Sequence, residues 1–476
     1  MPEKRKVHAT WVSRWRKQGV KMTSVRKIIA SASVLALGLG ALAGCGSDNA
    51  GTSDSEGKVY MLNSKPEVVD QLQELADAYT DETGVQVDVQ TASSGTYDTT
   101  LLSELAKDNA PTMFSTAGYA TFARYKKYLE PIQDSEVYGL LNDDAKANSQ
   151  KIGDDSYTIP YAVEYYGIIY NKKIVNEYAK KSYAVIKSAD GITGYDVLKK
   201  VVEDMNKHKD DLGIQAAFAT PGLESSDTYR FAAHMTRPPI FFEYRDNNTT
   251  FMKEIKGTYL DNYKDLFDLE MNNSPTERTM LGSKNYEDCT SEFALGDVAF
   301  YPNGVWAYSQ IKDNEVADED LGMLPYWMGV DGEEDYGPST VYEATWGINK
   351  NASKADQQAS LDFIKWMVTS DKGKEIMSKD MGFAVPFTTF GDDDQPDNPL
   401  VKAAKSWEDK GKKYMRSVDV PDQNWQNGIA NALLEYAQGT GEWDGVKSAI
   451  VDGWKSEWAA SEKSQGMLPG QTDFTW

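Results

Sequence analysis

The residue types that usually carry metal or redox chemistry are scarce in this sequence. It contains three His and two Cys, which are His8, His208, His234, Cys45 and Cys289. So few ligands cannot assemble a Cys/His zinc site. No G-x-G-x-x-G follows the first predicted strand and no G-x-x-x-x-G-K-[ST] occurs anywhere, so nucleotide chemistry is not indicated. We therefore predict neither a metal nor a cofactor, and turn to the carboxylates and to the aromatic residues, which make up 11% of the chain.

The chain is acidic, and its positive charge is concentrated at one end. Its 476 residues include 50 Lys and Arg and 73 Asp and Glu, a formal charge of −23. Residues 1–44 hold nine basic residues and one acidic residue, so the rest carries 41 and 72, a charge of −31. Such a chain is repelled by phosphate backbones, which argues against nucleic-acid binding. With 40% apolar residues it can build a sizeable core, and its length suggests more than one lobe.

The N-terminal residues have the pattern of a secretory signal. Basic residues precede an apolar run at 28–43, which is too short to span a bilayer and is followed by Gly44 and Cys45. The Leu-Ala-Gly-Cys junction resembles the bacterial lipobox. That resemblance implies that the leader, residues 1–44, is removed and that Cys45 receives a diacylglyceryl group. A plain signal peptide with an incidental Cys is the alternative.

Two stretches flank this signal. Met22 begins a leader of ordinary length, so we interpret residues 1–21 as an upstream start that is not used. Residues 46–57 are polar, Gly/Ser-rich and acidic, which together with Cys45 predicts a lipidated, flexible tether at 45–57. With a lipid on Cys45, Cys289 has no intrachain partner and is predicted to be a buried free thiol.

The first folded segment alternates strand and helix patterns. Residues 58–62, 85–89 and 113–115 predict strands, while apolar residues at helical spacing in 68–79 and 101–105 predict amphipathic helices. This alternation is typical of an α/β domain with parallel strands, which binds ligands at the carboxyl ends of those strands.

The ends of these elements carry several recognisable residues. Ser64 and Glu67 match a capping box before the first helix, and Gly84 stands where a C′ residue belongs. Asn63 and Tyr119 fall in the loops that follow the first and third strands, on the side expected to face a ligand.

Four segments resemble the extracellular solute-binding proteins of bacterial carbohydrate ABC importers. The first contains Tyr-x-x-Pro and Gly-x-x-Tyr-Asn-Lys, and its Ala-Val-Glu triplet, which ends at Glu164, resembles the maltodextrin-binding branch. The second contains that family's Gly-x-x-Ala-x-x-x-x-Gly-x-Trp pattern, which ends at Trp306. In the family's order the segments are 156–172 (SYTIPYAVEYYGIIYNK), 293–309 (FALGDVAFYPNGVWAYS), 347–386 and 438–459. The resemblance covers about residues 58–460.

The resemblance implies an α/β fold of the periplasmic-binding-protein type, with two lobes, hinge crossings and a ligand cleft between the lobes. The first lobe would comprise 58–162 plus 347–387 and the second 165–341 plus 396–470, with crossings near 161–165 and 341–346. Such a protein is not an enzyme: it captures a sugar or oligosaccharide, closes on it and delivers it to the permease subunits of the transporter. We expect a monomer anchored by lipid on the extracytoplasmic face of the cell membrane.

A sugar has a polar rim and an apolar face, so its site needs flat aromatic surface and fixed hydrogen-bonding groups. The resemblance implies Trp306 as a stacking residue and Glu164 as the carboxylate that accepts hydrogen bonds from sugar hydroxyls. For these and the other candidates the alternative is a structural role, such as core packing, a surface ion pair or a solvated loop. The other candidates are Trp346, Trp425, Tyr229, Tyr119 and Asn63.

The ligand and the activity have alternatives. Where the maltodextrin branch has Trp, Asp and Arg after the third strand, this chain has Ser-Thr-Ala-Gly-Tyr at 115–119, so its first-lobe contacts must differ. A secreted glycoside hydrolase would need two carboxyl groups about 5–10 Å apart, for which Glu164 and Glu343 are the pair to test. A third possibility is the same binding fold with a small polar solute other than a sugar.

Overall fold

The computed structural model describes residues 57–92 and 94–475. The leader, Cys45 and residues 46–56 of the predicted tether lie outside this part of the chain. In the part described, no helix combines the length and the apolar character needed to cross a membrane. Cys289 is buried and unpaired there, as predicted.

The first segment forms three parallel strands with helices between them, which confirms the predicted alternation. α1 buries Leu72, Leu75, Ala76 and Tyr79 at the predicted spacing but leaves Val69 exposed, and it ends at Gly84, whose φ of +82° favours glycine. The strands pair in the order β2-β1-β3. The elements are β1 (Val59–Asn63), α1 (Val69–Thr83), β2 (Val87–Thr91), α2 (Ser94–Glu104) and β3 (Met113–Ser115).

The predicted capping box at Ser64 and Glu67 is wrong. A short 3-10 turn, η1 (Pro66–Val68), precedes α1, and its N-cap, Lys65, makes no side-chain capping bond. The Glu67 carboxylate accepts a hydrogen bond from Lys65 Nζ at 3.3 Å. A charge-assisted bond to the ammonium is stronger than one to a backbone N–H, so Glu67 turns toward Lys65.

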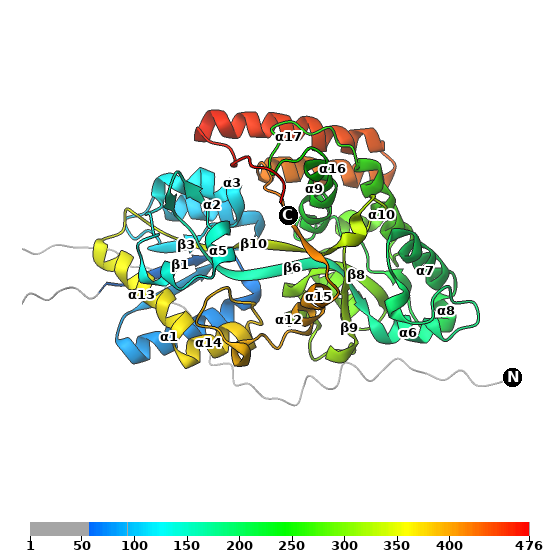
Figure 1. Cartoon of the computed structure of the whole chain (residues 1–476), viewed down its shortest axis with the longest axis horizontal. Coiled ribbons are helices and arrows are strands. Elements are labelled where there is room, and N and C mark those ends of the chain that lie inside the picture. Colours follow the sequence, from blue (N-terminus) through cyan, green and yellow to red (C-terminus); the bar gives the residue numbers. More distant parts are fainter. Residues whose placement is uncertain (1–56, 93, 476) are drawn as a thin grey trace, which may run out of the picture. The chain divides into compact units, whose positions relative to one another are not determined.

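Two strands of 13 residues, β6 (Ile159–Asn171) and β10 (Tyr336–Ile348), run antiparallel through the middle of the sheet. The strand order is β2-β1-β3-β10-β6-β8-β7, with β11 on β10 and β9 on β6. Both predicted crossings fall within these long strands, which link β1 and β3 with β8 in Figure 1. The remaining strands of this sheet are β7 (Ala216–Phe218), β8 (Val298–Gly304), β9 (Leu321–Leu324) and β11 (Lys413–Arg416).

Helices cover the sheet at both ends of the long strands (Figure 1). Their bounds are α3 (Gly118–Tyr125), α4 (Glu136–Gly139), α5 (Asp143–Asn148), α6 (Lys172–Ala179), α7 (Tyr195–Lys207), α8 (Lys209–Leu212), α9 (Arg237–Asp246), α10 (Leu260–Asn272), α11 (Tyr286–Ala294), α12 (Tyr308–Ile311), α13 (Lys354–Thr369), α14 (Asp371–Glu375), α15 (Pro399–Asp409), α16 (Gln423–Gln438) and α17 (Trp443–Gln465).

The apolar core forms three clusters, and the largest of them includes residues from both ends of the long strands. One cluster packs β1, α1 and α13 together, and another packs the helices around β8. The largest cluster includes α16 and α17 and reaches α3, where the ring centroids of Tyr119 and Trp458 lie 5.8 Å apart. α17, red in Figure 1, runs above α16 and α9. The end of the sheet that holds β3 therefore also touches the C-terminal helices.

Candidate functional site

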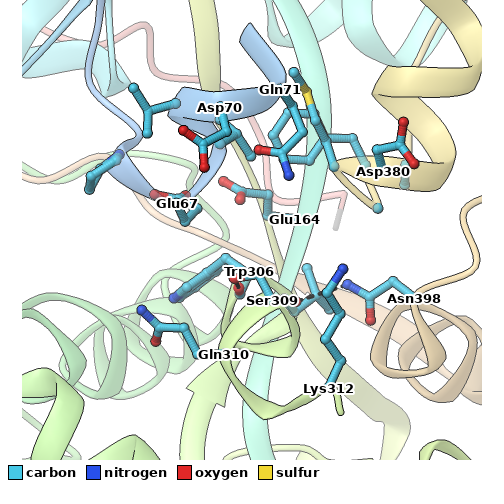
Figure 2. A pocket seen from close by; sticks show the side chains of 18 of the residues that line it. Glu67, Asp70, Gln71, Glu164, Trp306, Ser309, Gln310, Lys312, Asp380 and Asn398 are labelled. Carbon is cyan, nitrogen blue, oxygen red and sulfur yellow. Dashed lines mark hydrogen bonds between the residues drawn. The ribbon is translucent and has the colours of Figure 1, made fainter. Parts of the chain in front are cut away.

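A cavity of about 250 Å³ beside β6 brings Trp306 and Glu164 together. Its walls come from segments far apart in the sequence: the start of α1, the loop at 380–384 and the residues that follow β8. Figure 2 shows Glu164 between the two walls. The labelled residues of the α1 wall are Glu67, Asp70 and Gln71, and those of the opposite wall are Trp306, Ser309, Gln310 and Lys312.

Trp306 is held by one edge and borders the cavity with its ring. It lies in the short turn η6 (Val305–Ala307), directly after β8. Its Nε1 donates to Tyr229 Oη at 3.2 Å, and Tyr229 Oη donates to Asn303 Oδ1 at 3.2 Å. Its ring centroid lies 5.2 Å from that of His234. Because the ring is only partly buried, it can offer apolar surface to a ligand in the cavity.

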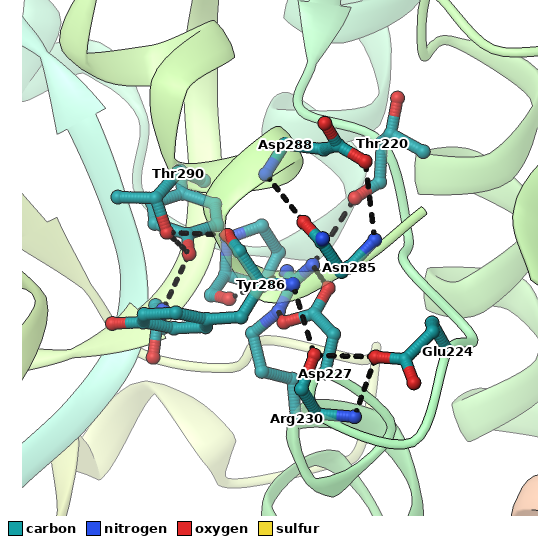
Figure 3. A network of polar contacts seen from close by, with 12 residues as sticks. Thr220, Glu224, Asp227, Arg230, Asn285, Tyr286, Asp288 and Thr290 are labelled. Carbon is teal, nitrogen blue, oxygen red and sulfur yellow. Dashed lines mark hydrogen bonds and ion pairs between the residues drawn. The ribbon is translucent and has the colours of Figure 1, made fainter. Parts of the chain in front are cut away.

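A buried arginine fixes the segments that hold Trp306 (Figure 3). Arg230 Nε donates to Asp227 Oδ1 at 2.8 Å, and its Nη1 and Nη2 donate to the carbonyls of Pro302 at 2.9 Å and Thr220 at 3.1 Å. Pro302 lies in β8, and Tyr229 directly precedes Arg230. The guanidinium thus ties Tyr229 to the end of β8, from which Trp306 emerges.

Glu164 is paired with Lys65, which directly precedes the first residues of the α1 wall of the cavity. Lys65 Nζ lies 2.8 Å from Glu164 Oε1, and the side chains are 15% and 7% exposed. Burial raises the pKa of Glu164, and the Lys65 ammonium opposes that rise. Burial lowers the pKa of Lys65, but Glu164 and Glu67 outweigh it and the net shift is upward. The site therefore contains an ion pair whose remaining hydrogen-bonding positions can serve a polar ligand.

A second ion pair lies on the neighbouring strand. Arg237, at the start of α9 and 3% exposed, pairs with Glu343 of β10. Arg237 Nη1 also donates to Ser417 Oγ at 2.7 Å, and Ser417 Oγ lies 2.8 Å from Tyr166 Oη. The register of β10 against β6 shifts between Val341 and Ala344, where Glu343 leaves the regular ladder.

The other predicted site residues are buried at separate places. Asn63 donates from Nδ2 to Lys65 O at 2.7 Å, so it shapes the loop that presents Lys65. Trp346 is stacked on Tyr161, with ring centroids 3.9 Å apart. Tyr119 packs on Trp458, and its Oη has no hydrogen-bond partner in the part of the chain that the structure describes.

Trp425 belongs to the packing between α16 and α17. It is 2% exposed, its Nε1 donates to Ile450 O at 3.0 Å, and its ring lies 5.4 Å from Trp454. We expect Trp425→Ala to lower the free energy of unfolding by about 3–5 kcal/mol through loss of packing. Saccharide affinity of the protein that remains folded should change little. Denaturant melts and calorimetry test both points, and a large affinity loss at wild-type stability would place Trp425 in the ligand site instead.

Sequence reasoning did not select His234 or Arg237 as site residues, and it did not pair Lys65 with Glu164. Lys65 is 99 positions from Glu164 and Arg237 is 106 positions from Glu343, so no local pattern reports either pair. His234 stacks on Tyr166 with centroids 4.3 Å apart. The Tyr229-Arg230 segment was a signal for this region, because His234 and Arg237 follow it within the next two helical turns.

A curated relative found by sequence is a maltotriose-binding protein. It comes from Pyrococcus abyssi (strain GE5 / Orsay) and is 25% identical over 262 residues, 54% of this chain. The matched part spans about half the length of that relative.

Solved structures with the same fold match almost over their full lengths. The GacH receptor of Streptomyces glaucescens GLA.O, solved unliganded and with acarbose, gives a TM-score of 0.63 at 17% identity, over 85% of this chain and 99% of that one. The maltose/maltodextrin-binding domain MalE from Bdellovibrio bacteriovorus, bound to maltotriose, gives 0.62 at 13% identity, over 85% and 100%. These matches show the two-lobed α/β fold.

A family model provides the assignment. The model for bacterial extracellular solute-binding proteins matches residues 74–407, which span β2, both long strands and the cavity residues Glu164 and Trp306. The chain belongs to the bacterial extracellular solute-binding protein family.

Proposed function

We propose that this protein captures an oligosaccharide between two lobes, residues 58–162 plus 347–387 and 165–341 plus 396–470, and delivers it to an ABC permease. One observation carries the proposal: Trp306 and Glu164 line the same cavity, facing each other from different segments. A flat ring and an adjacent carboxylate suit the apolar face and the hydroxyl rim of a pyranose. The relatives named for maltotriose and acarbose support the same ligand class.

The proposed activity is binding without catalysis. A retaining or inverting hydrolase needs one carboxyl group that donates a proton and one that acts as nucleophile or base. Glu164 and Glu343, the pair that would serve, are each engaged by a cation, Lys65 and Arg237. The Lys65 ammonium opposes the rise that burial causes in the pKa of Glu164, and the paired carboxylate can accept hydrogen bonds, which suits a binding protein.

We also propose a lipid anchor at Cys45 that holds a monomer on the extracytoplasmic side of the membrane. The apolar run at 28–43, the Leu-Ala-Gly-Cys junction and the polar residues 46–57 support it. An intact-mass measurement of the mature chain tests it. We expect a diacylated N-terminal cysteine, and a mature chain without lipid would contradict the anchor.

Calorimetric titration with maltotriose, raffinose, stachyose and chitin oligosaccharides tests the proposed ligand class. At least one of them should bind with a free energy of about −8 kcal/mol or better and be recovered intact by chromatography. Absence of heat with every saccharide would refute the sugar, whereas appearance of shorter saccharides would refute binding without catalysis.

A further inference from the structure

Three carboxylates follow one another across the neighbouring strands β6, β10 and β11. Glu164 lies on β6, Glu343 on β10, and Asp419 three residues after the end of β11. The Glu343 charge contributes to raising the pKa of both the Glu164 and the Asp419 carboxyl groups. Together with the strand order, this places Glu343 between the other two. Two strand spacings of about 4.8 Å make this row roughly 10 Å long, longer than one pyranose ring.

Asp419 differs from the other two carboxylates in having no partner. Lys65 neutralises Glu164 and Arg237 neutralises Glu343, whereas Asp419 makes no hydrogen bond or ion pair with any described residue. Burial, with a further contribution from Glu343, raises the pKa of Asp419 to about 6, and Arg237 opposes the rise. A partly buried carboxylate without a donor is costly, so a function for it is to be expected.

Unused polar atoms from both ends of the long strands lie near this carboxylate or near its neighbour Arg237. Tyr119 Oη, His234 Nδ1 and Arg237 Nε are buried and have no hydrogen-bond partner among the described residues. Tyr119 and Arg237 both interact electrostatically with Asp419, and Arg237 does so with His234. Each such atom costs about 1–3 kcal/mol when it stays unpaired. A sugar hydroxyl, which both donates and accepts, can satisfy a carboxylate and one of these atoms together.

The region is open to solvent on one side. The Glu343 side chain is 34% exposed, and the neighbouring Gly118 is partly buried but directly follows the exposed Ala117. A Cβ at Gly118 would lie 3.2 Å from Glu343 Oε1, so a glycine there keeps the approach to the carboxylates clear. A ligand that starts at Trp306 and Glu164 can therefore extend along the row toward Asp419.

We propose that Asp419 is a ligand-binding residue for a second sugar unit, so that the site selects saccharides of two or more units lying across β6, β10 and β11. Asp419 accepts hydrogen bonds from hydroxyls of that unit, and Arg237, His234 and Tyr119 supply the complementary contacts. This inference rests on the proposed function and adds chain-length selection to it.

Calorimetry with Asp419→Asn tests the inference directly. The probes are glucose, maltose and maltotriose in one series, and galactose, raffinose and stachyose in the other. Wild type should bind the oligosaccharides of one series. For those oligosaccharides we expect Asp419→Asn to lower the affinity about 10- to 100-fold, and for the monosaccharide of the same series we expect a much smaller decrease. Asp409→Asn, at an exposed acid at the end of α15, is the matched control and should bind as wild type does.

Proton competition supplies a second readout. A hydroxyl donates to the ionised carboxylate, so oligosaccharide affinity should fall as the pH drops below about 6 in wild type and depend less on pH in Asp419→Asn. The charged or titratable groups that face Asp419 are Glu343, Arg237, Tyr119 and Tyr244. Tyr119→Phe, which removes one hydroxyl, should weaken oligosaccharide binding less than Asp419→Asn does.

The outcomes separate this inference from the proposed function. If Asp419→Asn loses affinity equally for monosaccharide and oligosaccharide, or loses none for either, the proposed role of Asp419 is overturned. Saccharide binding by wild type would still leave the proposed function intact. If wild type binds no member of either series, the proposed function fails and the inference fails with it. The melting temperature of Asp419→Asn at pH 7 should not fall, because the variant removes an unpaired charge. If it does fall, the monosaccharide and oligosaccharide affinities of Tyr119→Phe are compared instead, and equal affinities to those of wild type would overturn the inference.

Discussion

Replacing Trp306 with alanine should weaken saccharide binding by about 2–4 kcal/mol, roughly 30- to 1,000-fold, with little change in melting temperature. The reason is geometric: the indole borders the cavity, and its Nε1 is already held by Tyr229 Oη at 3.2 Å. The variant removes the flat surface on which a pyranose face can rest. Tyr229 keeps its own hydrogen bond to Asn303, so the site beneath should stay in place.

Trp366→Ala is the matched control for this experiment. Trp366 lies on α13, outside the cavity, and its Nε1 donates to Glu82. Its removal should affect stability but not affinity, as measured by calorimetry on the same saccharide. Should Trp306→Ala lower the melting temperature by many degrees and leave affinity unchanged, Trp306 is a core residue and not a ligand contact.

Replacing Lys65 with methionine should lower the free energy of unfolding by about 3–5 kcal/mol, because Glu164 is left buried without its counter-charge. The variant protein should also bind saccharide more weakly, because Glu164 then loses the cation that keeps it ionised as an acceptor. Denaturant unfolding and calorimetry measure the two effects separately.

The double variant Lys65→Met/Glu164→Gln separates the two causes. It removes both charges, so its stability should return most of the way to that of wild type while its affinity stays low. If Lys65→Met alone is as stable as wild type, the pair is screened by solvent and does not organise the site.

Local sequence patterns predicted the elements of the fold correctly where the cause is local. The spacing of Leu72, Leu75 and Tyr79 set the buried face of α1, and Gly84 ended it because a left-handed φ favours glycine. The capping box failed at Glu67 because Lys65, two residues away, competes for the carboxylate. That competition could not be read from Ser64 and Glu67 alone.

The candidate site was harder to predict, because burial of a ring depends on distant segments. Trp346 stacks on Tyr161 of β6, 185 positions earlier in the chain, and Trp425 packs between two C-terminal helices. Both were placed near the ligand only by resemblance. Trp306 and Glu164 do share a cavity, and the pairing of Lys65 with Glu164 became visible only through the fold.

Small-angle scattering of wild type and Trp306→Ala, with and without the saccharide that calorimetry identifies, tests the central claim most directly. In our proposal the ligand contacts both lobes, so saturating wild type should reduce its radius of gyration, and Trp306→Ala should show no reduction at the same concentration. A saccharide that binds wild type tightly but leaves its scattering unchanged would contradict capture between two closing lobes.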